Sequence, residues 1–144
     1  MTAQMVEMLH YRGREYAMWS CPSLSTLDGV IDVGGFAETN TALRRGYYGT
    51  WSIEEGRLFL TEIHGVLIDG RDVTLELLVP GCGRRAFAKG FSGNLDCPLE
   101  NADHEFRMCT KFLRLHVERG AVVSEEELDG DVLEREYRER WRPG

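Results

Sequence analysis

The segment that decides the fold runs from Tyr47 to Ile63 and reads YYGTWSIEEGRLFLTEI. Two runs rich in aromatic and aliphatic residues flank the polar residues Glu54 and Glu55 and the glycine Gly56. Such an arrangement is typical of two strands joined by a tight turn. The apolar residues fall on both parities of each run, which indicates that both faces of the hairpin are at least partly covered. We therefore predict a central hairpin with arms at 47–53 and 58–63.

The same pattern of polar residue and glycine occurs twice more, at Arg12 with Gly13 and at Arg119 with Gly120. Glycine adopts a positive φ at little cost, whereas Arg and Glu resist it. We therefore expect a type I turn with Gly at the left-handed position in all three places. Three such turns predict a sheet built from hairpins.

Further strands are predicted by alternating apolar residues at Val73 to Val79 and at Leu113 to Val117. The run Ala86 to Asp96 is interrupted on its apolar face, so we expect a bulged or edge strand there. From Asp131 to Trp141 the period changes, with an apolar residue at every fourth position, which predicts a helix capped by Asp131. The apolar stripe of this helix comprises Leu133, Tyr137 and Trp141.

These elements predict a mostly β, β-rich α+β fold. We expect an antiparallel sheet of about seven to nine strands built from hairpins, arranged as a sandwich or an open barrel, with a C-terminal helix at about 131–141. A chain of 144 residues fits one domain, so the prediction is a single β-rich domain over 1–144.

The overall charge limits the classes of partner. Seventeen Lys and Arg residues against twenty-four Asp and Glu residues give a formal net charge of −7. A field of that sign repels nucleic acid and acidic membrane surfaces, so neither is expected as a partner. The four cysteines form no C-x-x-C pair, and neither a secretory leader nor a membrane span is recognisable. We therefore expect a cytoplasmic protein with free thiols.

The segment Thr39 to Ile53, followed by Leu58 to Leu60, resembles a group of small uncharacterised bacterial proteins. They share an Arg-Gly-Tyr…Trp-x-Ile…Leu-aromatic-Leu segment and a later Phe-x-Gly-x-Leu strand, which corresponds to Phe91 to Leu95 here. An aliphatic strand and hairpin follow, at Leu113 to Val123. The resemblance covers about residues 12–128 and implies a bacterial cytosolic protein. No activity is known for the group, so it supplies no catalytic residues.

One candidate site is centred on Glu62 and His64. Two residues apart on one strand, they are expected to share a face with Leu58 and Leu60. A carboxylate and an imidazole at the end of an apolar stripe are suited to acid–base chemistry in a pocket mouth. Tyr47 and the pair Arg44 and Arg45 are expected nearby, as ligand-binding candidates, because the other arm begins there. The alternative is that Glu62 and His64 are simply solvated.

Two further candidates concern a thiol and a group of aromatic residues. Cys82 lies between glycines beside Arg84 and Arg85, whose charges would lower its pKa and favour a nucleophilic thiolate. No known cysteine-enzyme signature surrounds it, so the alternative is a loop cysteine without a catalytic role. Tyr47, Tyr48 and Trp51 are candidates for lining a ligand groove or an interface, or for packing in the core.

A metal site is not expected. Cys97, His104 and Cys109 are the nearest approach to a ligand set, but no two of them have the close spacing of zinc ligands. The chain also lacks a phosphate-binding glycine loop and a nucleophile elbow. We therefore expect neither a metal nor a cofactor.

The hypothesis that follows is a small cytosolic protein-binding module and not an enzyme. One form of it is an immunity or inhibitor protein whose acidic surface binds a basic partner. Another is a regulatory subunit that dimerises. The alternative is a small enzyme or small-molecule binder with a pocket near Glu62, His64, Tyr47 and Arg45. The sequence specifies neither the oligomeric state nor the identity of the partner.

Overall fold

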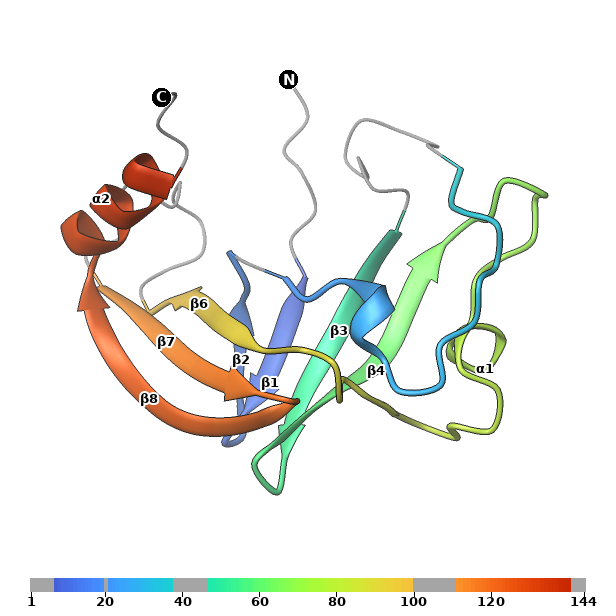
Figure 1. The fold of residues 1–144 in the computed structure, drawn as a ribbon, viewed down its shortest axis with the longest axis horizontal. Helices are drawn as coiled ribbons and strands as arrows, with labels where there is room; N and C mark the ends of the chain where they lie inside the picture. Colours follow the sequence, from blue (N-terminus) through green and yellow to red (C-terminus); the bar gives the residue numbers. More distant parts are fainter. Residues whose placement is uncertain (1–6, 20, 38–46, 100–110, 141–144) are drawn as a thin grey trace.

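The computed structural model of the chain describes residues 7–19, 21–37, 47–99 and 111–140 (Figure 1). The N-terminal half contains the strands β1 (Met8–Tyr11), β2 (Arg14–Ala17), β3 (Tyr47–Glu54) and β4 (Arg57–Gly65), with a 3₁₀ helix at Leu24–Thr26. The C-terminal half adds α1 (Leu75–Leu78), β5 (Ala86–Phe87), β6 (Gly93–Pro98), β7 (Lys111–Glu118), β8 (Ala121–Asp129) and α2 (Gly130–Arg140).

The strands form one open, eight-stranded sheet in the order β2-β1-β3-β4-β8-β7-β6, with β5 paired to β4. All pairs are antiparallel except β1 with β3, which run parallel. The predicted β-rich fold with a C-terminal helix is thus confirmed; the helix begins at Gly130, so Asp131 lies in its first turn and is not the cap that was predicted. The parallel pair was not expected. It is possible because the long connection from β2 to β3 returns the chain to the same end of the sheet.

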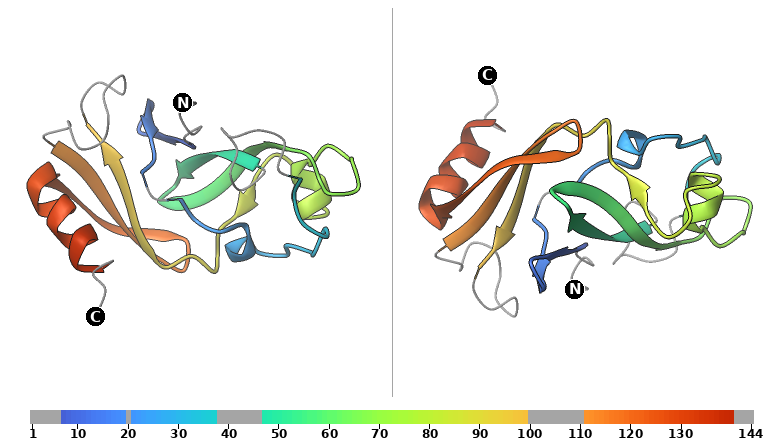
Figure 2. Two further views of the ribbon diagram at one scale, coloured as in Figure 1. Left: turned by 90° about the horizontal axis from the view of Figure 1, so that it is seen from above. Right: turned by 90° about the horizontal axis from the view of Figure 1, so that it is seen from below.

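The sheet consists of two halves that meet at one point. β4 and β8 share a single residue pair, Arg57 with Ala121, flanked by hydrogen bonds from Leu58 N–H to Gly120 O and from Val122 N–H to Gly56 O. Beyond this junction the two strands separate, as the views from above and below show (Figure 2). The far edges approach again where Trp19 N–H donates to Asp96 O at 2.8 Å. The sheet therefore curls around an interior.

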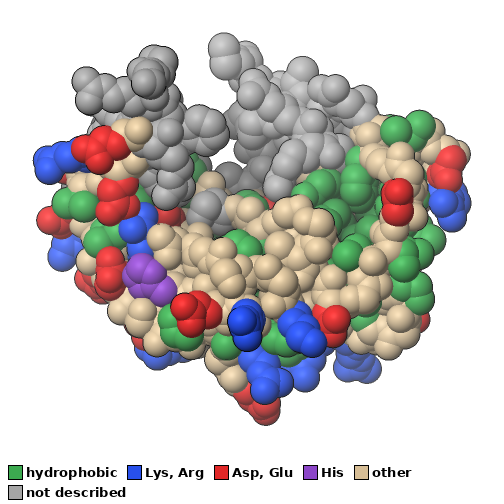
Figure 3. Space-filling model, viewed as in Figure 1, with side chains coloured by type: hydrophobic (Ala, Val, Ile, Leu, Met, Phe, Trp, Pro, Cys, Tyr) green, Lys and Arg blue, Asp and Glu red, His purple; other side chains and the backbone are tan. Residues whose placement is uncertain are grey.

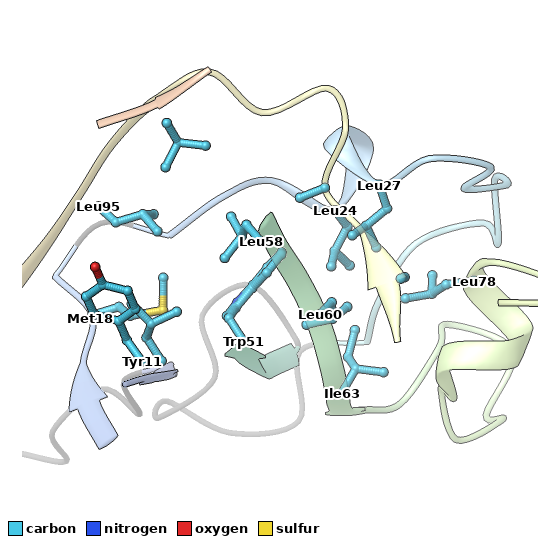
Figure 4. Packing of buried hydrophobic residues seen from close by; sticks show 14 of the residues in the cluster. Tyr11, Met18, Leu24, Leu27, Trp51, Leu58, Leu60, Ile63, Leu78 and Leu95 are labelled. Carbon is cyan, nitrogen blue, oxygen red and sulfur yellow. The ribbon is translucent and has the colours of Figure 1, made fainter. Parts of the chain in front are cut away.

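The main core fills that interior (Figure 4). Trp51, Leu58 and Leu60 come from the central hairpin, and Leu95 and Leu115 come from β6 and β7, all with an exposed fraction of 0%. A second, smaller cluster lies on the opposite face of β7. There Phe112 stacks on Trp19, with ring centroids 5.1 Å apart, and packs against the buried Leu133 of α2. This contact confirms that the helix packs on the sheet; the side chains of Tyr137 and Trp141 lie outside the described residues.

The three predicted hairpin turns are confirmed, but their type is different. In each turn the residue before glycine also has a positive φ: 51° at Arg12, 53° at Glu55 and 48° at Arg119. Each two-residue loop is therefore a type I′ turn, not a type I turn. The physical reason is that the twist of a type I′ turn matches the right-handed twist of the strands it joins.

A bulge in β4 changes which side chains face the core. Thr50 lies opposite Glu62, but Trp51 lies opposite Leu60, so Thr61 is an extra residue in the ladder. The parity of burial therefore shifts there: Leu60 is buried on one side of the bulge and Ile63 on the other. The prediction that Glu62 and His64 share a face with Leu58 and Leu60 is wrong for this reason.

The predicted strand at Val73 to Val79 is also wrong. Residues Leu75–Leu78 form one helical turn, α1, which begins where the Thr74 side chain accepts a hydrogen bond from Leu77 N–H at 3.1 Å. An N-cap of this kind stabilises a helix start, and a short apolar run fits either a strand or a buried helix. The predicted interruption of Ala86 to Asp96 is real, since the run divides into the short strand β5 and the strand β6.

Candidate functional site

The structure leaves the predicted Glu62–His64 pair on the surface. Glu62 Oε1 lies 3.2 Å from His64 Nε2, and the two side chains are 60% and 47% exposed. Tyr48, opposite His64 on β3, stacks on the imidazole with ring centroids 4.9 Å apart. The pair therefore forms a solvated cross-strand cluster, and neither hollow described below includes it.

Of the other residues expected around that pocket, Tyr47 does not join the Glu62–His64 pair. Tyr47 packs against the main core and contacts Phe36, with ring centroids 4.7 Å apart. Arg44 and Arg45 lie outside the described residues. Tyr47 and His64 contact different surroundings, so the structure does not bring these two predicted residues together.

Trp51 is a core residue. Its exposed fraction is 0%, and its indole N–H points to the carboxylate of Glu7 at 3.4 Å. The same oxygen of Glu7 accepts Gly49 N–H at 2.8 Å, and Glu7 itself is only 1% exposed. This carboxylate links the start of β1 to β3 from within the interior, so of the three candidate aromatic residues Trp51 cannot line an open groove.

Cys82 does not have the environment that its neighbours suggested. Burial and then the charge of Glu76 raise the pKa of its thiol, and Glu76 Oε2 lies 3.9 Å from the sulfur. The expected lowering of the pKa by Arg84 and Arg85 is therefore wrong. Cys82 is held as a thiol, which is the less nucleophilic form.

Cys97 is fully buried in β6, and burial raises the pKa of its thiol to about 12. His104 and Cys109, the other two residues weighed as metal ligands, lie outside the described residues. Within the part of the chain that the structure describes, no group of three or more His, Cys, Asp or Glu side chains is placed to hold a metal ion. That part also contains no helix long and apolar enough to cross a membrane.

The acidic character of the chain is concentrated on β8 and the start of α2. Residues 121–131 contain five carboxylates and no Lys or Arg. We name these five residues the acidic edge: Glu125, Glu126, Glu127, Asp129 and Asp131. All of them are exposed. A short segment therefore carries a charge of −5, out of a net charge of −7 for the chain.

The first of these carboxylates, Glu125, faces the gap between the two halves of the sheet. Its Oε1 lies 2.7 Å from Arg12 NH2 and accepts a hydrogen bond from Tyr11 OH at 3.3 Å. Burial and the nearby charge of Glu125 raise the pKa of Tyr11. Beside this contact is a hollow of about 380 Å³, to which Ile53 and Val122 contribute apolar atoms.

Glu126 faces the other side of β8, where its Oε2 lies 3.3 Å from His116 Nε2. A second hollow, of about 470 Å³, lies next to this pair and is lined in part by Asn94, His116 and Ser124. The remaining acidic-edge residues, Glu127, Asp129 and Asp131, make no ion pair in the described part of the chain. Lys111 of β7 lies directly opposite Asp129 in the ladder, so one cation is close to this end of the acidic edge.

Arg114 connects α2 to the sheet beside this edge. Arg114 on β7 makes two hydrogen bonds to Asp96, at 2.7 and 3.2 Å, and contacts Glu136 of α2 at 2.8 Å. Burial opposes the charge of Arg114, but the hydrogen bonds and charges of Asp96 and Glu136 prevail and raise its pKa. Removing one partner of such a pair is strongly destabilising. Arg114 thus holds β6, β7 and α2 together next to the acidic edge.

Positive charge gathers elsewhere. Figure 3 shows Lys and Arg side chains at the lower end of the molecule, where Figure 1 places the hairpin turns. Arg12, Arg14, Arg57 and Arg119 all lie in or next to those turns. The molecule therefore has a basic hairpin end near the start of β8, and the acidic edge begins four residues further along that strand, at Glu125.

Sequence reasoning missed the extent of β8. The resemblance placed the last strand and hairpin at Leu113 to Val123, whereas β8 continues to Asp129 through three consecutive glutamates, which are unfavourable for a strand. The available signal was the turn at Arg119 and Gly120, since the arm from Lys111 to Glu118 needs a partner of similar length.

Comparisons with protein-family models, with curated proteins and with solved structures found no match to this chain. The resemblance of residues 39–53 to a group of small bacterial proteins therefore stays a prediction.

Proposed function

We propose that this protein is a binding module that takes up a basic segment of a partner protein at the acidic edge. The observation that supports this most is the run of five exposed carboxylates without a cation over residues 121–131. Charges arranged in this way attract a positively charged partner and accelerate association. An immunity or inhibitor protein that covers a basic partner is one biological form of this function, and a regulatory subunit is another.

The acidic edge is better suited to a protein than to a small molecule. The adjoining hollow at Ile53 and Val122 is open, and the carboxylates extend along a strand instead of converging on one point. The alternative, a small enzyme or small-molecule binder at Glu62 and His64, has less support because both side chains are about half exposed or more. We therefore place the function on the surface of β8.

The test is a comparison of two variants with the same change in net charge. Glu127→Gln with Asp129→Asn removes two charges from the acidic edge, and Glu62→Gln with Asp69→Asn removes two charges elsewhere. The probe is a labelled panel of synthetic peptides rich in Lys and Arg, with fluorescence anisotropy as the readout at low and high salt.

We expect the acidic-edge variant to bind the panel about tenfold more weakly than the control variant, because each lost exposed ion pair contributes roughly 0.2–1 kcal/mol. Binding should also weaken as salt is raised, since exposed charges are screened. Absence of binding to every basic peptide at low salt, or equal weakening by both variants, would refute the proposal.

A further inference from the structure

The edge of β8 that faces away from β7 has no strand partner beyond Ala121 in the described part of the chain. Val122 N–H donates to Gly56 O and therefore points toward β4. Val123 is an extra residue in the ladder, and Ser124 then lies opposite His116. In an antiparallel ladder, hydrogen-bonded pairs alternate with non-hydrogen-bonded pairs. Every second residue after Ser124, beginning with Glu125, therefore directs its backbone N–H and C=O away from β7. These residues are Glu125, Glu127 and Asp129.

The same three residues present their side chains on one face of β8. Glu125 shows which face this is, since it contacts Tyr11 and Arg12 of the first hairpin. Residues two apart in a strand share a face, so Glu127 and Asp129 follow Glu125 on that side. The residues whose backbone groups point away from β7 are therefore also the residues whose carboxylates share this face of β8.

No other edge in the described residues offers this combination. β2 is only four residues long, and β6 is approached at Asp96 by the backbone of Trp19. β8 is nine residues long, and its residues Ser124 to Glu127 are all exposed. A row of unpaired N–H and C=O groups of this kind is a template for another strand.

We infer that the partner adds to β8 as an extended strand that places Lys or Arg at two alternate positions, opposite Glu127 and Asp129. This inference rests on the proposed function and specifies the form of the ligand. Two basic positions are expected, not three, because Arg12 already neutralises Glu125 at 2.7 Å. The basic hairpin end near Ala121 also favours a partner whose cations lie toward the Asp129 end.

A second copy of this chain is the less favourable occupant. Pairing two β8 edges antiparallel would place the carboxylates of one copy against those of the other, and like charges directly opposite each other destabilise a strand pair. The same repulsion excludes acidic strands in general. The occupant is therefore a basic, extended segment.

The experiment uses the full chain and three capped peptides of identical composition, each with two Arg residues in a background of Thr and Val. The Arg residues are two positions apart in the first peptide, adjacent in the second and three positions apart in the third. We expect the first to bind about tenfold more tightly than the others, because only it places both cations on one face of an added strand. Equal binding of all three would overturn the inference but leave the proposed function standing.

N-methylation of the first peptide then tests the backbone contacts. Methylation at one set of alternate residues should weaken binding at least about tenfold, and methylation at the other set should change it little, because only one set faces β8. Equal effects at both sets would refute strand addition. Loss of binding by all basic peptides would instead refute the proposed function itself.

Discussion

Cys97 shows how strongly a single position depends on its surroundings. The residue lies in β6 opposite Leu113, and its exposed fraction is 0%. Burial, with a smaller contribution from the charge of Asp96, raises the pKa of the thiol from 9.0 to about 12. The folded protein therefore retains this proton to a higher pH than the unfolded chain does.

This difference gives a stability that depends on pH with a defined sign. The contribution is fully present below about pH 9 and is lost as the pH rises toward 12, because the unfolded chain then releases the proton first. Above about pH 9.5, the free energy of unfolding of the unaltered protein should fall with pH more steeply than that of the Cys97→Ala variant. The difference between the two slopes should be about 1.4 kcal/mol per pH unit. Urea unfolding followed by circular dichroism at several pH values measures both slopes. Equal slopes for the two proteins would contradict a raised pKa for the Cys97 thiol.

At the scale of elements, the backbone of the three hairpin turns is strained, and strand pairing on either side offsets that strain. Arg12, Glu55 and Arg119 all adopt positive φ values, which cost a non-glycine residue about 1–2 kcal/mol each. The strands on either side fix this conformation through their registers. Two of the glycines that follow, Gly56 and Gly120, have nearly the same φ but different surroundings.

These two glycines form a matched pair for mutation. A Cβ at Gly56 would meet nothing within 4 Å, whereas a Cβ at Gly120 would lie 2.6 Å from Ala88 O and from a ring carbon of Phe87. Gly56→Ala should therefore lower the free energy of unfolding by about 1 kcal/mol through backbone strain alone. Gly120→Ala should cost about 1–3 kcal/mol more, because the turn must also move away from Ala88. Thermal or urea unfolding measures both, and equal losses would show that the close approach at Gly120 is unimportant.

The elements also show what a sequence reveals and what it does not. The three turns could be predicted because a glycine after a polar residue acts locally. The run from Val73 to Val79 could not, because a one-turn helix capped by Thr74 and a short strand have the same apolar pattern. The prediction that Glu62 and His64 share a face with Leu58 and Leu60 was wrong because Thr61 is an extra residue in the ladder. Such a bulge depends on the partner strand, and the sequence of β4 alone does not indicate it.

At the scale of the molecule, the charge of β8 has a second consequence, which concerns self-association. A nine-residue strand with an open edge invites pairing with another copy, and exposed charges are one means of preventing this. Glu127→Thr with Asp129→Thr removes that protection and also introduces good strand formers. We expect sedimentation velocity to show larger species for this variant than for the unaltered protein at the same concentration.

The control for this prediction is Glu62→Thr with Asp69→Thr, which makes the same change in net charge away from β8. Its sedimentation should match that of the unaltered protein. Equal association of both variants would attribute the effect to net charge and not to the edge.

The arrangement of the whole could be predicted only in part. The hairpins imply an antiparallel sheet, but the parallel contact of β1 with β3 and the approach of Trp19 to Asp96 join residues far apart in the sequence. The open edge of β8 could not be predicted for the same reason. It exists because β4 pairs with β8 only at Arg57 and Ala121 and then separates from it. Composition indicated an acidic surface and a basic partner, but it could not indicate which strand carries the charge.

The single junction between Arg57 and Ala121 has a consequence for the order in which the chain folds. On one side of it, β6, β7 and β8 pair with their neighbours in sequence, and α2 follows directly. On the other side, β1 pairs with β3 through residues far apart in the sequence, such as Met8 with Thr50. Contacts between residues close in sequence form faster than contacts between distant residues. We therefore expect β6, β7 and β8 to assemble first and β1 to join the sheet later.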